Sequence, residues 1–225
     1  MQLLSVNLAI PHQSEHTDAE HKWTGIDKRP TSEPVAVRAP GPRGTGGSGL
    51  AGDTIGNLRY HGGEEQAVYA YAREELDRWE RELGRTLPNG VFGENLTMRD
   101  TAVDDALVGE RWQIGAPGTG PLLEVSTTRF PCRTFAGWLG EQGWLKRFTA
   151  RHRAGAYLRV RTPGEVRAGD TVTVVHRPDH DVSVSHVFRA LTGEPELLPH
   201  ILTAGELLDP LVRERALRRT GRSLA

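Results

Sequence analysis

The chain has 225 residues, enough to bury the core of one large domain with or without a small appendage. Its formal net charge of −1 at pH 7 gives no general attraction to nucleic acid or to an anionic membrane, so we expect neither as a partner. The start of the chain lacks the features of a signal peptide, no apolar run approaches the ~20 residues of a membrane span, and the single cysteine excludes an internal disulfide, which together predict a soluble, cytoplasmic protein.

The first 178 residues have the pattern of a mainly β domain. Short runs rich in Val, Leu and Thr alternate with loops that contain Gly and Pro, which favours a barrel or a sandwich. One helix is predicted at 73–83, where Leu76, Trp79 and Leu83 form an apolar stripe and Gly84 follows as a C-cap. The segment just before it, 67–71, fits either a strand or the first turns of that helix. The predicted strands lie at 3–9, 34–39, 111–115, 122–128, 156–161 and 170–177.

The pattern becomes helical at residues 179–225. So few residues do not form a secure core alone, and we expect this extension to dock on the β domain or on a second subunit, as in a homodimer. The chain is therefore divided into a β domain at 1–178, expected to be barrel-like or a sandwich, and a C-terminal helical extension at 179–225. Three helices are predicted: 184–191 closed by Gly193, 195–204 closed by Gly205, and 210–219 with Asp209 as N-cap and Pro210 at its first position.

A glycine-rich segment, "GTGGSG" at 44–49, formally matches the dinucleotide-binding pattern Gly-x-Gly-x-x-Gly. No helical pattern follows it, and Asp53 comes too early to be the acid that binds a ribose. We therefore interpret 40–49 as a mobile loop.

Three other segments carry polar residues that suit either a turn or a ligand. The cluster in "KWTGIDKRP" at 22–30 is typical of solvated surface but also of a phosphate site. "YHGGEEQAVYAY" at 60–71 contains two glycines that make a tight turn or let a ligand approach the backbone. "NGVFGENLT" at 89–97 follows a crowded bend with a carboxylate and an amide, and internal bracing is the ordinary role of those groups. The candidate residues in these segments are Lys28, Arg29, His61, Gly62, Glu94 and Asn95.

The only cysteine, Cys132, follows the predicted strand at 122–128 and lies between Arg129 and Arg133 in the sequence. Nearby guanidinium groups favour a thiolate, which is the form that attacks electrophiles or binds a soft metal. The ordinary alternative is a buried, inert cysteine. Pro131 and the two arginines favour the reactive interpretation without deciding it.

Taken together, these segments resemble the MOSC domain family and, within it, the YiiM-like branch. The resemblance covers residues 1–178, and the helical tail is similar to the three-helix extension of that branch. No single segment is decisive, and the order and number of the segments make the match specific. They are "TGIDKRP" (24–30), "GLAGD" (49–53), "YHGGEEQAVYAY" (60–71), "W…LG" (79–84), "FGENLT" (92–97), "VGERWQIG" (108–115), "LLEVSTTRFPC" (122–132) and "GAYLRV…GEVRAGD" (155–170).

The resemblance implies a β-barrel-like fold that binds the molybdenum cofactor, molybdopterin, and gives no reason to expect pyridoxal phosphate. Cys132 corresponds to the cysteine of the family, so its thiolate is the implied molybdenum ligand. Basic groups and loop N–H groups are expected to meet the phosphate, while amide, carboxylate and imidazole groups read the pterin edge. The implied cofactor-binding residues are Lys28, Arg29, His61, Gly62, Glu94, Asn95, Arg129 and Cys132.

Two positions depart from the family pattern. Thr128 stands where the family commonly has Pro before the Arg, and Asn57 stands where it often has Asp. The first departure affects the loop that carries Cys132, and the second removes a carboxylate near the site. The glycine-rich stretch 40–49 lies close to the expected rim and is a candidate lid.

The resemblance favours a molybdenum-dependent oxidoreductase that reduces small N-hydroxylated compounds such as hydroxylaminopurines or amidoximes. Cys132, His61 and Glu94 are the catalytic candidates, with His61 as proton donor because an unperturbed imidazole titrates near neutrality, and Glu94 as the alternative. The chain has no flavin signature and too few cysteines for an iron–sulfur cluster, so an external electron-donor protein is implied. The alternative is a non-catalytic sulfur carrier or cofactor-delivery module with a Cys132 persulfide. A cysteine hydrolase is disfavoured because no orienting triad is recognisable.

Overall fold

The computed structural model describes residues 1–221. Its strands are β1 Gln2–Ala9, β2 His12–Gln13, β3 Trp23–Thr24, β4 Lys28–Thr31, β5 Val35–Val37, β6 Val68–Ala72, β7 Leu96–Arg99, β8 Arg111–Ile114, β9 Leu122–Thr128, β10 Ala156–Thr162, β11 Gly164–Val166 and β12 Val172–His176. The α-helices are α1 Arg73–Leu83, α2 Arg133–Leu139, α3 Trp144–Arg151, α4 Val184–Thr192, α5 Leu198–Ile201 and α6 Pro210–Arg219. Short 3₁₀ turns are η1 Glu64–Gln66, η2 Val103–Asp105, η3 Pro195–Leu197 and η4 Leu202–Leu207.

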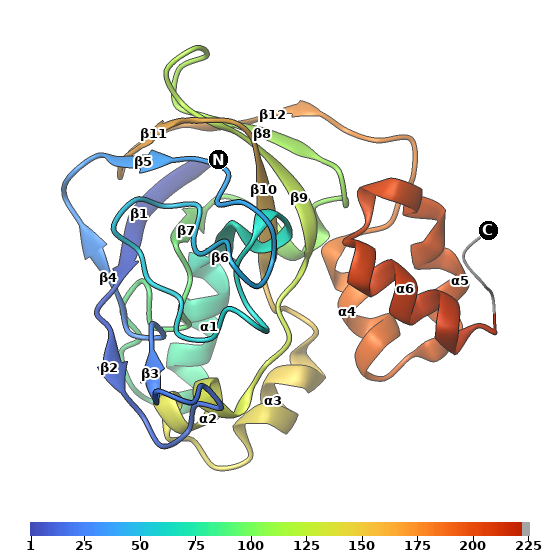
Figure 1. The fold of residues 1–225 in the computed structure, drawn as a ribbon, viewed down its shortest axis with the longest axis horizontal. Helices are drawn as coiled ribbons and strands as arrows, with labels where there is room; N and C mark the ends of the chain where they lie inside the picture. The colour runs from blue at the N-terminus through green and yellow to red at the C-terminus, as the bar shows by residue number, and fades with distance from the viewer. Residues whose placement is uncertain (222–225) are drawn as a thin grey trace.

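Eight strands form one curved sheet in the order β12-β8-β9-β10-β6-β7-β1-β4 (Figure 1). All neighbouring pairs are antiparallel except β6 and β7. The sheet bends until the start of β1 meets the turn before β12, where Leu3 N donates to Asp170 O at 2.9 Å and Val172 N donates to Met1 O at 3.0 Å. The sheet is barrel-like without being a closed barrel, which confirms the predicted mainly β fold with added helices.

Two apolar clusters lie on opposite faces of this sheet. One is aliphatic and includes Leu3, Leu123 and Leu158. The other is aromatic and lies where α1, α2 and α3 cover the sheet, with Phe92 and Trp144 both fully buried (Figure 1). Because both of its faces are covered, β6 is buried along its whole length. A strand of this kind is a continuous apolar run, which explains why its sequence did not distinguish it from a helix.

The predicted helix at 73–83 is confirmed as α1, and Gly84 ends it in the left-handed conformation. The structure adds two helices that the sequence patterns did not predict, α2 and α3, between β9 and β10. Cys132 is the residue that immediately precedes α2. The thiol therefore lies on a short strand-to-helix connection, which holds it more firmly than a long loop would.

The C-terminal helices pack against one side of the sheet (Figure 1). Ser183 caps α4 and Asp209 caps α6, as the sequence predicted for Asp209. The predicted middle helix at 195–204 is instead divided into η3, α5 and η4. The C-terminal helices share an apolar cluster with Val108 of the sheet region, and the Phe188 ring stacks on Phe130 with ring centres 5.8 Å apart. This contact continues directly into the site described below.

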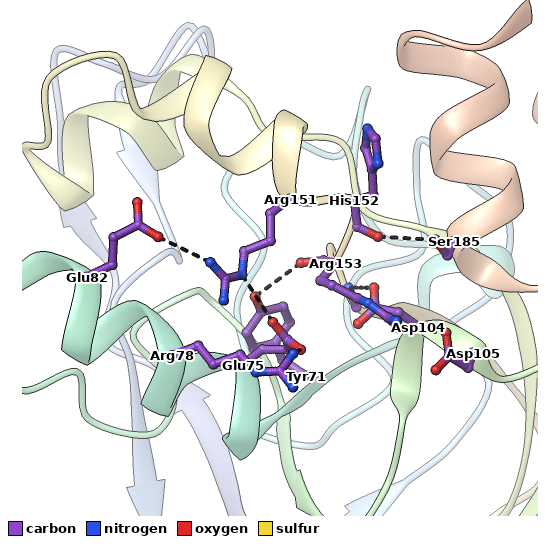
Figure 2. A network of polar contacts seen from close by, with 11 residues as sticks. Tyr71, Glu75, Arg78, Glu82, Asp104, Asp105, Arg151, His152, Arg153 and Ser185 are labelled. Carbon is purple, nitrogen blue, oxygen red and sulfur yellow. Dashed lines mark hydrogen bonds and ion pairs between the residues drawn. The ribbon is translucent and has the colours of Figure 1, made fainter.

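A polar network joins α1, α3, α4 and the turn before β10 (Figure 2). Arg151 lies between Glu75 and Glu82, and the Ser185 hydroxyl donates to the carbonyl oxygen of His152 at 3.3 Å. Next to Asp105, at one side of the network, the buried carboxylate of Asp104 accepts a hydrogen bond from Gly155 N at 2.8 Å (Figure 2). Burial raises the pKa of Asp104 to about 7.

None of the helices within residues 1–221 combines the length and the apolar character that a membrane crossing requires.

Candidate functional site

A cavity of about 430 Å³ lies at the end of the sheet where β9 runs into α2. Its walls come from segments that are distant in the sequence. The loop after β9 contributes Arg129 and Cys132, β10 contributes Tyr157, and the turn before η1 contributes His61. A volume of this size is within the ordinary range for a small-molecule site.

Cys132 lines this cavity and is half-buried. It packs partly against the aromatic cluster, and the rest of its surface is accessible. The sequence placed it at the point where a strand leaves the sheet, and the structure confirms that position. Of its two neighbouring arginines only Arg129 shares the cavity, because the exposed side chain of Arg133 turns toward Asp18 and the backbone of Glu15.

Arg129 is the dominant positive group of the cavity wall. It is only 5 % exposed, and its guanidinium lies 4.3 Å from the centre of the Phe135 ring and 5.1 Å from that of Tyr69. It donates to the carbonyl oxygen of Phe92, but within residues 1–221 it forms no ion pair with a carboxylate. A buried guanidinium with no counter-charge is a strong attractor for an anion.

Lys28 also lines the cavity, but its charge is neutralised inside the protein. Its ammonium donates to Asp53, and both side chains are buried. Asp53 also accepts hydrogen bonds from Ala9 N and from Asn95 Nδ2, each at 2.9 Å. Burial alone would raise the pKa of Asp53, but the charge and the hydrogen bond of Lys28 outweigh that effect and hold the pKa below its ordinary value.

Arg29 and Glu94, both expected in the site, lie outside its lining. The side chain of Arg29 is 64 % exposed and pairs with Asp27. Adjacent residues of a strand point to opposite faces, so Lys28 and Arg29 were not able to share one pocket. Glu94 is fully buried, and its carboxylate accepts from Gly90 N at 2.6 Å and from the Thr97 hydroxyl at 2.9 Å. Bracing of the 89–97 loop accounts for its hydrogen bonds.

His61 faces the cavity, but its protonation differs from the sequence-based expectation. Burial, together with the charges of Arg129 and Arg43, lowers the pKa of His61 to about 4. At neutral pH the imidazole is therefore uncharged and carries a proton on one nitrogen only. His61 therefore does not titrate near neutrality here, and the sequence-based reason for expecting it to be the proton donor is wrong.

Residues 57–173, more than half of the chain, match the MOSC domain. The chain belongs to the MOSC domain family. It is 29 % identical over 187 residues to the uncharacterized protein YflK of Bacillus subtilis (strain 168), which is 83 % of this chain and 79 % of YflK. It is also 31 % identical over 155 residues to a reductase of Gibberella moniliformis. That match covers 67 % of this chain but only 27 % of the reductase. The crystal structure of YiiM from Geobacillus stearothermophilus superposes with a TM-score of 0.76 at 26 % identity and covers 97 % of this chain and 98 % of that one. The expected resemblance to the YiiM-like branch is thus confirmed.

In this MOSC protein the two glycines after His61 allow the glycine-rich stretch at 40–49 to pack closely against their turn. Gly62 and Gly63 have φ of +80° and +79°, and a Cβ on Gly63 would lie 2.6 Å from the Cα of Arg43. Gly63 N donates to Gly47 O at 3.1 Å. The glycine-rich stretch, expected to be a mobile loop, is hydrogen-bonded to this turn and delivers Arg43 to the cavity.

Arg43 was missed by the sequence reasoning, as were Gln66 and Tyr157. Arg43 lies in a low-complexity stretch, which carried no signal of its own. Gln66 and Tyr157 lie within "YHGGEEQAVYAY" and "GAYLRV", two of the segments that carry the family resemblance. Membership of these family segments was the only sequence signal that could have marked Gln66 and Tyr157 as site residues.

The cavity residues suit a metal whose other ligands come mainly from a bound cofactor and not from the protein. Within residues 1–221 no group of three or more His, Cys, Asp and Glu side chains is arranged to hold a metal ion. The cavity instead offers one soft sulfur ligand, Cys132, beside the cationic groups of Arg129 and Arg43. A thiolate suits a soft or high-valent metal, and the guanidinium groups suit an anionic carrier such as a pterin phosphate.

Proposed function

We propose that this MOSC protein binds the molybdenum cofactor in the cavity, with Cys132 as the one protein ligand of the metal, and reduces N-hydroxylated compounds. The observation that carries the proposal is the placement of the only cysteine, half-buried, in a 430 Å³ cavity that also contains an unneutralised buried arginine. The reductase name of the fungal relative agrees with this activity, although the chain spans 27 % of that protein.

The anionic part of the cofactor would be held by Arg129 and Arg43 in this proposal. Both guanidinium groups line the cavity, and neither forms an ion pair with a carboxylate within residues 1–221. Lys28 would act differently, because Asp53 already neutralises it. The pair of Lys28 and Asp53 orients Asn95 and stiffens the wall. This assignment replaces the expectation that Lys28 and Arg29 hold a phosphate together.

When bound, the molybdenum centre would supply the two-electron redox chemistry that removes the substrate oxygen. The overall balance is an N-hydroxyl compound plus two electrons and two protons, giving the amine or amidine and water. The electrons would come from an external protein that carries a reduced flavin or iron–sulfur group. The chain itself would position the substrate against the Cys132 side of the cavity and exclude bulk water.

His61 would serve as a neutral hydrogen-bonding group in the site. It borders the cavity, and the positive charges of Arg129 and Arg43 help to keep its pKa low. A neutral imidazole donates from one nitrogen and accepts at the other, which suits the edge of a pterin or purine ring. Glu94, fully buried and hydrogen-bonded within its own loop, would only support that loop.

The decisive experiment is expression in a host that makes the cofactor, followed by metal analysis and pterin fluorescence on the purified protein. One molybdenum per chain, and reduction of a hydroxylaminopurine with a chemical electron donor, would support the proposal. Protein from such a host that carries a cyanide-labile sulfur on Cys132 and no molybdenum would instead show a sulfur carrier. Control expression in a host that cannot make the cofactor should give a folded protein without molybdenum.

A further inference from the structure

Most of the neutral polar side chains around the cavity are already hydrogen-bonded within the protein. Asn95 accepts from Tyr69 N at 3.1 Å and donates to Asp53. The Tyr69 hydroxyl donates to Ala154 O at 2.7 Å, and the Thr128 hydroxyl donates to Gly155 O at 3.2 Å. These groups shape the wall, and their hydrogen-bonding capacity toward a ligand is largely used.

Gln66 is an exception. It lies at the end of η1 and lines the cavity, and its Oε1 is buried without a hydrogen-bond partner in the described chain. Burial of an unpaired amide oxygen costs about 1–3 kcal/mol, so such atoms are uncommon in native proteins. A ligand that donates to this oxygen removes that cost.

Tyr157 is the second exception. Its position in β10 is opposite Tyr69 in β6, and the two ring centres are 5.2 Å apart. Unlike those of Tyr69 and Tyr71, its hydroxyl has no protein partner within residues 1–221. Tyr157 lines the same cavity as Cys132 and Arg129. Burial raises the pKa of Tyr157, so the phenol remains a hydrogen-bond donor through the neutral range.

The two residues come from neighbouring elements. The Ser126 hydroxyl bridges the backbone of η1 and β10, because it lies within hydrogen-bonding distance of the carbonyl oxygens of both Glu65 and Tyr157. Gln66, the next residue after Glu65, and Tyr157 therefore enter the cavity from adjacent positions. Together they give this one cavity an unpaired acceptor and an unpaired donor.

We propose that Gln66 and Tyr157 bind the N-hydroxyl end of the substrate and distinguish it from the reduced product. An N–OH group presents a hydrogen to the amide oxygen of Gln66 and an oxygen to the hydroxyl of Tyr157. The corresponding amine keeps a hydrogen but has lost the oxygen, so Tyr157 is left without its acceptor. Product is then held less tightly than substrate. This inference depends on the proposed function, since it names the part of the substrate that the same site recognises.

The test compares the binding of a hydroxylaminopurine and of the matching aminopurine to the molybdenum-loaded protein, without an electron donor. The variants are Gln66→Met and Tyr157→Phe, which keep size and remove one polar group each. The matched controls are Gln142→Met, on the exposed surface, and Tyr71→Phe, whose hydroxyl donates to Arg153 O outside the cavity. Molybdenum content and thermal stability are measured for every variant.

We expect the parent and both controls to prefer the hydroxylaminopurine. Tyr157→Phe should reduce that preference roughly 2- to 12-fold, the equivalent of one hydrogen bond, and Gln66→Met should weaken the hydroxylaminopurine by a similar factor. If both variants keep the parent's dissociation constants and molybdenum content, the inference is wrong while the proposed function stands. A loaded parent that shows no such preference, and that does not reduce the hydroxylaminopurine when a chemical electron donor is then added, would overturn the proposed function as well.

Discussion

Lys28 and Asp53 form a buried ion pair in the wall of the cavity, 25 residues apart in the chain. Lys28, the cation that the family resemblance led us to expect at a phosphate, is therefore balanced by the protein itself. Arg129, in contrast, is buried without a carboxylate partner in the described chain. The electrostatic attraction of the cavity for an anion arises from the arginines and not from the lysine.

Arg43→Met is expected to weaken cofactor binding about 3- to 10-fold at low salt, with a smaller effect at high salt, because it removes a half-buried cation from the cavity wall. Within residues 1–221 the only hydrogen bond of the Arg43 side chain is the one it donates to Tyr60 O at 2.7 Å, so the thermal midpoint should change little. Arg29→Met is the matched control, since its exposed side chain pairs with Asp27 away from the cavity. Affinity is measured by titration with the isolated cofactor. Equal losses in both variants would show that Arg43 does not bind the cofactor.

Cys132→Ser is expected to fold normally and to lose molybdenum, because a hydroxyl is a much poorer ligand than a thiolate for a soft metal. The side chain is half-buried and leaves no large cavity on substitution, so a change in unfolding free energy of less than about 1 kcal/mol is expected. Metal analysis of the purified variant checks the first expectation and urea unfolding the second. A variant that retains the parental amount of molybdenum would show that the sulfur is not a ligand.

Gly63→Ala is expected to lower stability by about 1–3 kcal/mol and to displace Arg43. The position has φ of +79°, and the added methyl would meet the backbone of Arg43. Gly44→Ala is the control, because its φ is +92° but no atom lies within 4 Å of its added Cβ. In both variants alanine must adopt a positive φ, which costs stability. Only in Gly63→Ala does the new methyl also collide with the backbone of Arg43. Similar losses of both stability and cofactor affinity in the two variants would show that the Gly63 contact does not position Arg43.

Asp104→Asn is expected to change how stability depends on pH. The folded state raises the pKa of Asp104 to about 7 from an ordinary value of 3.8, so it binds this proton more tightly than the unfolded state does. The stabilisation is complete below about pH 4 and is lost as pH rises to about 7. Asparagine does not titrate, so the free energy of unfolding of the variant should rise relative to that of the parent, by up to about 4 kcal/mol between pH 4 and pH 7.

Urea unfolding at pH 4.5, 6 and 8 measures this difference. The control is Asp105→Asn, which changes the adjacent carboxylate that pairs with Arg153 at 2.5 Å (Figure 2). It should keep the slope of the parent. A constant difference between Asp104→Asn and the parent at all three pH values would refute the assignment.

Much of the fold was predictable from local patterns. The strands from β8 to β10 and helix α1 follow from apolar spacing and from a glycine stop, since these signals act over a few residues. Helices α2 and α3 were not predicted. Their buried residues, which include Phe135, Trp144 and Phe148, are aromatic and serve a cluster shared with α1. Tertiary packing stabilises such short helices more than intrinsic propensity does.

The candidate site was predictable in part. The family segments pointed to Cys132, Arg129, His61 and Asn95, and the structure brings these four to one cavity. Arg29 and Glu94 have similar sequence signals, but strand alternation turns the first outward and loop bracing occupies the second. The pKa of His61 was not predictable, because it depends on burial and on Arg43, which reaches the cavity from a segment with no evident motif.

The sequence by itself determined the family, the mainly β fold, the helical extension and the presence of one thiol beside arginine, because these depend on residue type and on short-range order. Only the tertiary structure decided which charges are neutralised and which polar groups remain available to a ligand. Those properties depend on pairs such as Lys28 with Asp53 and on neighbours such as Gln66 and Tyr157. Contacts between segments distant in the chain set burial and hydrogen bonding, and burial sets the strength of every charge in the site.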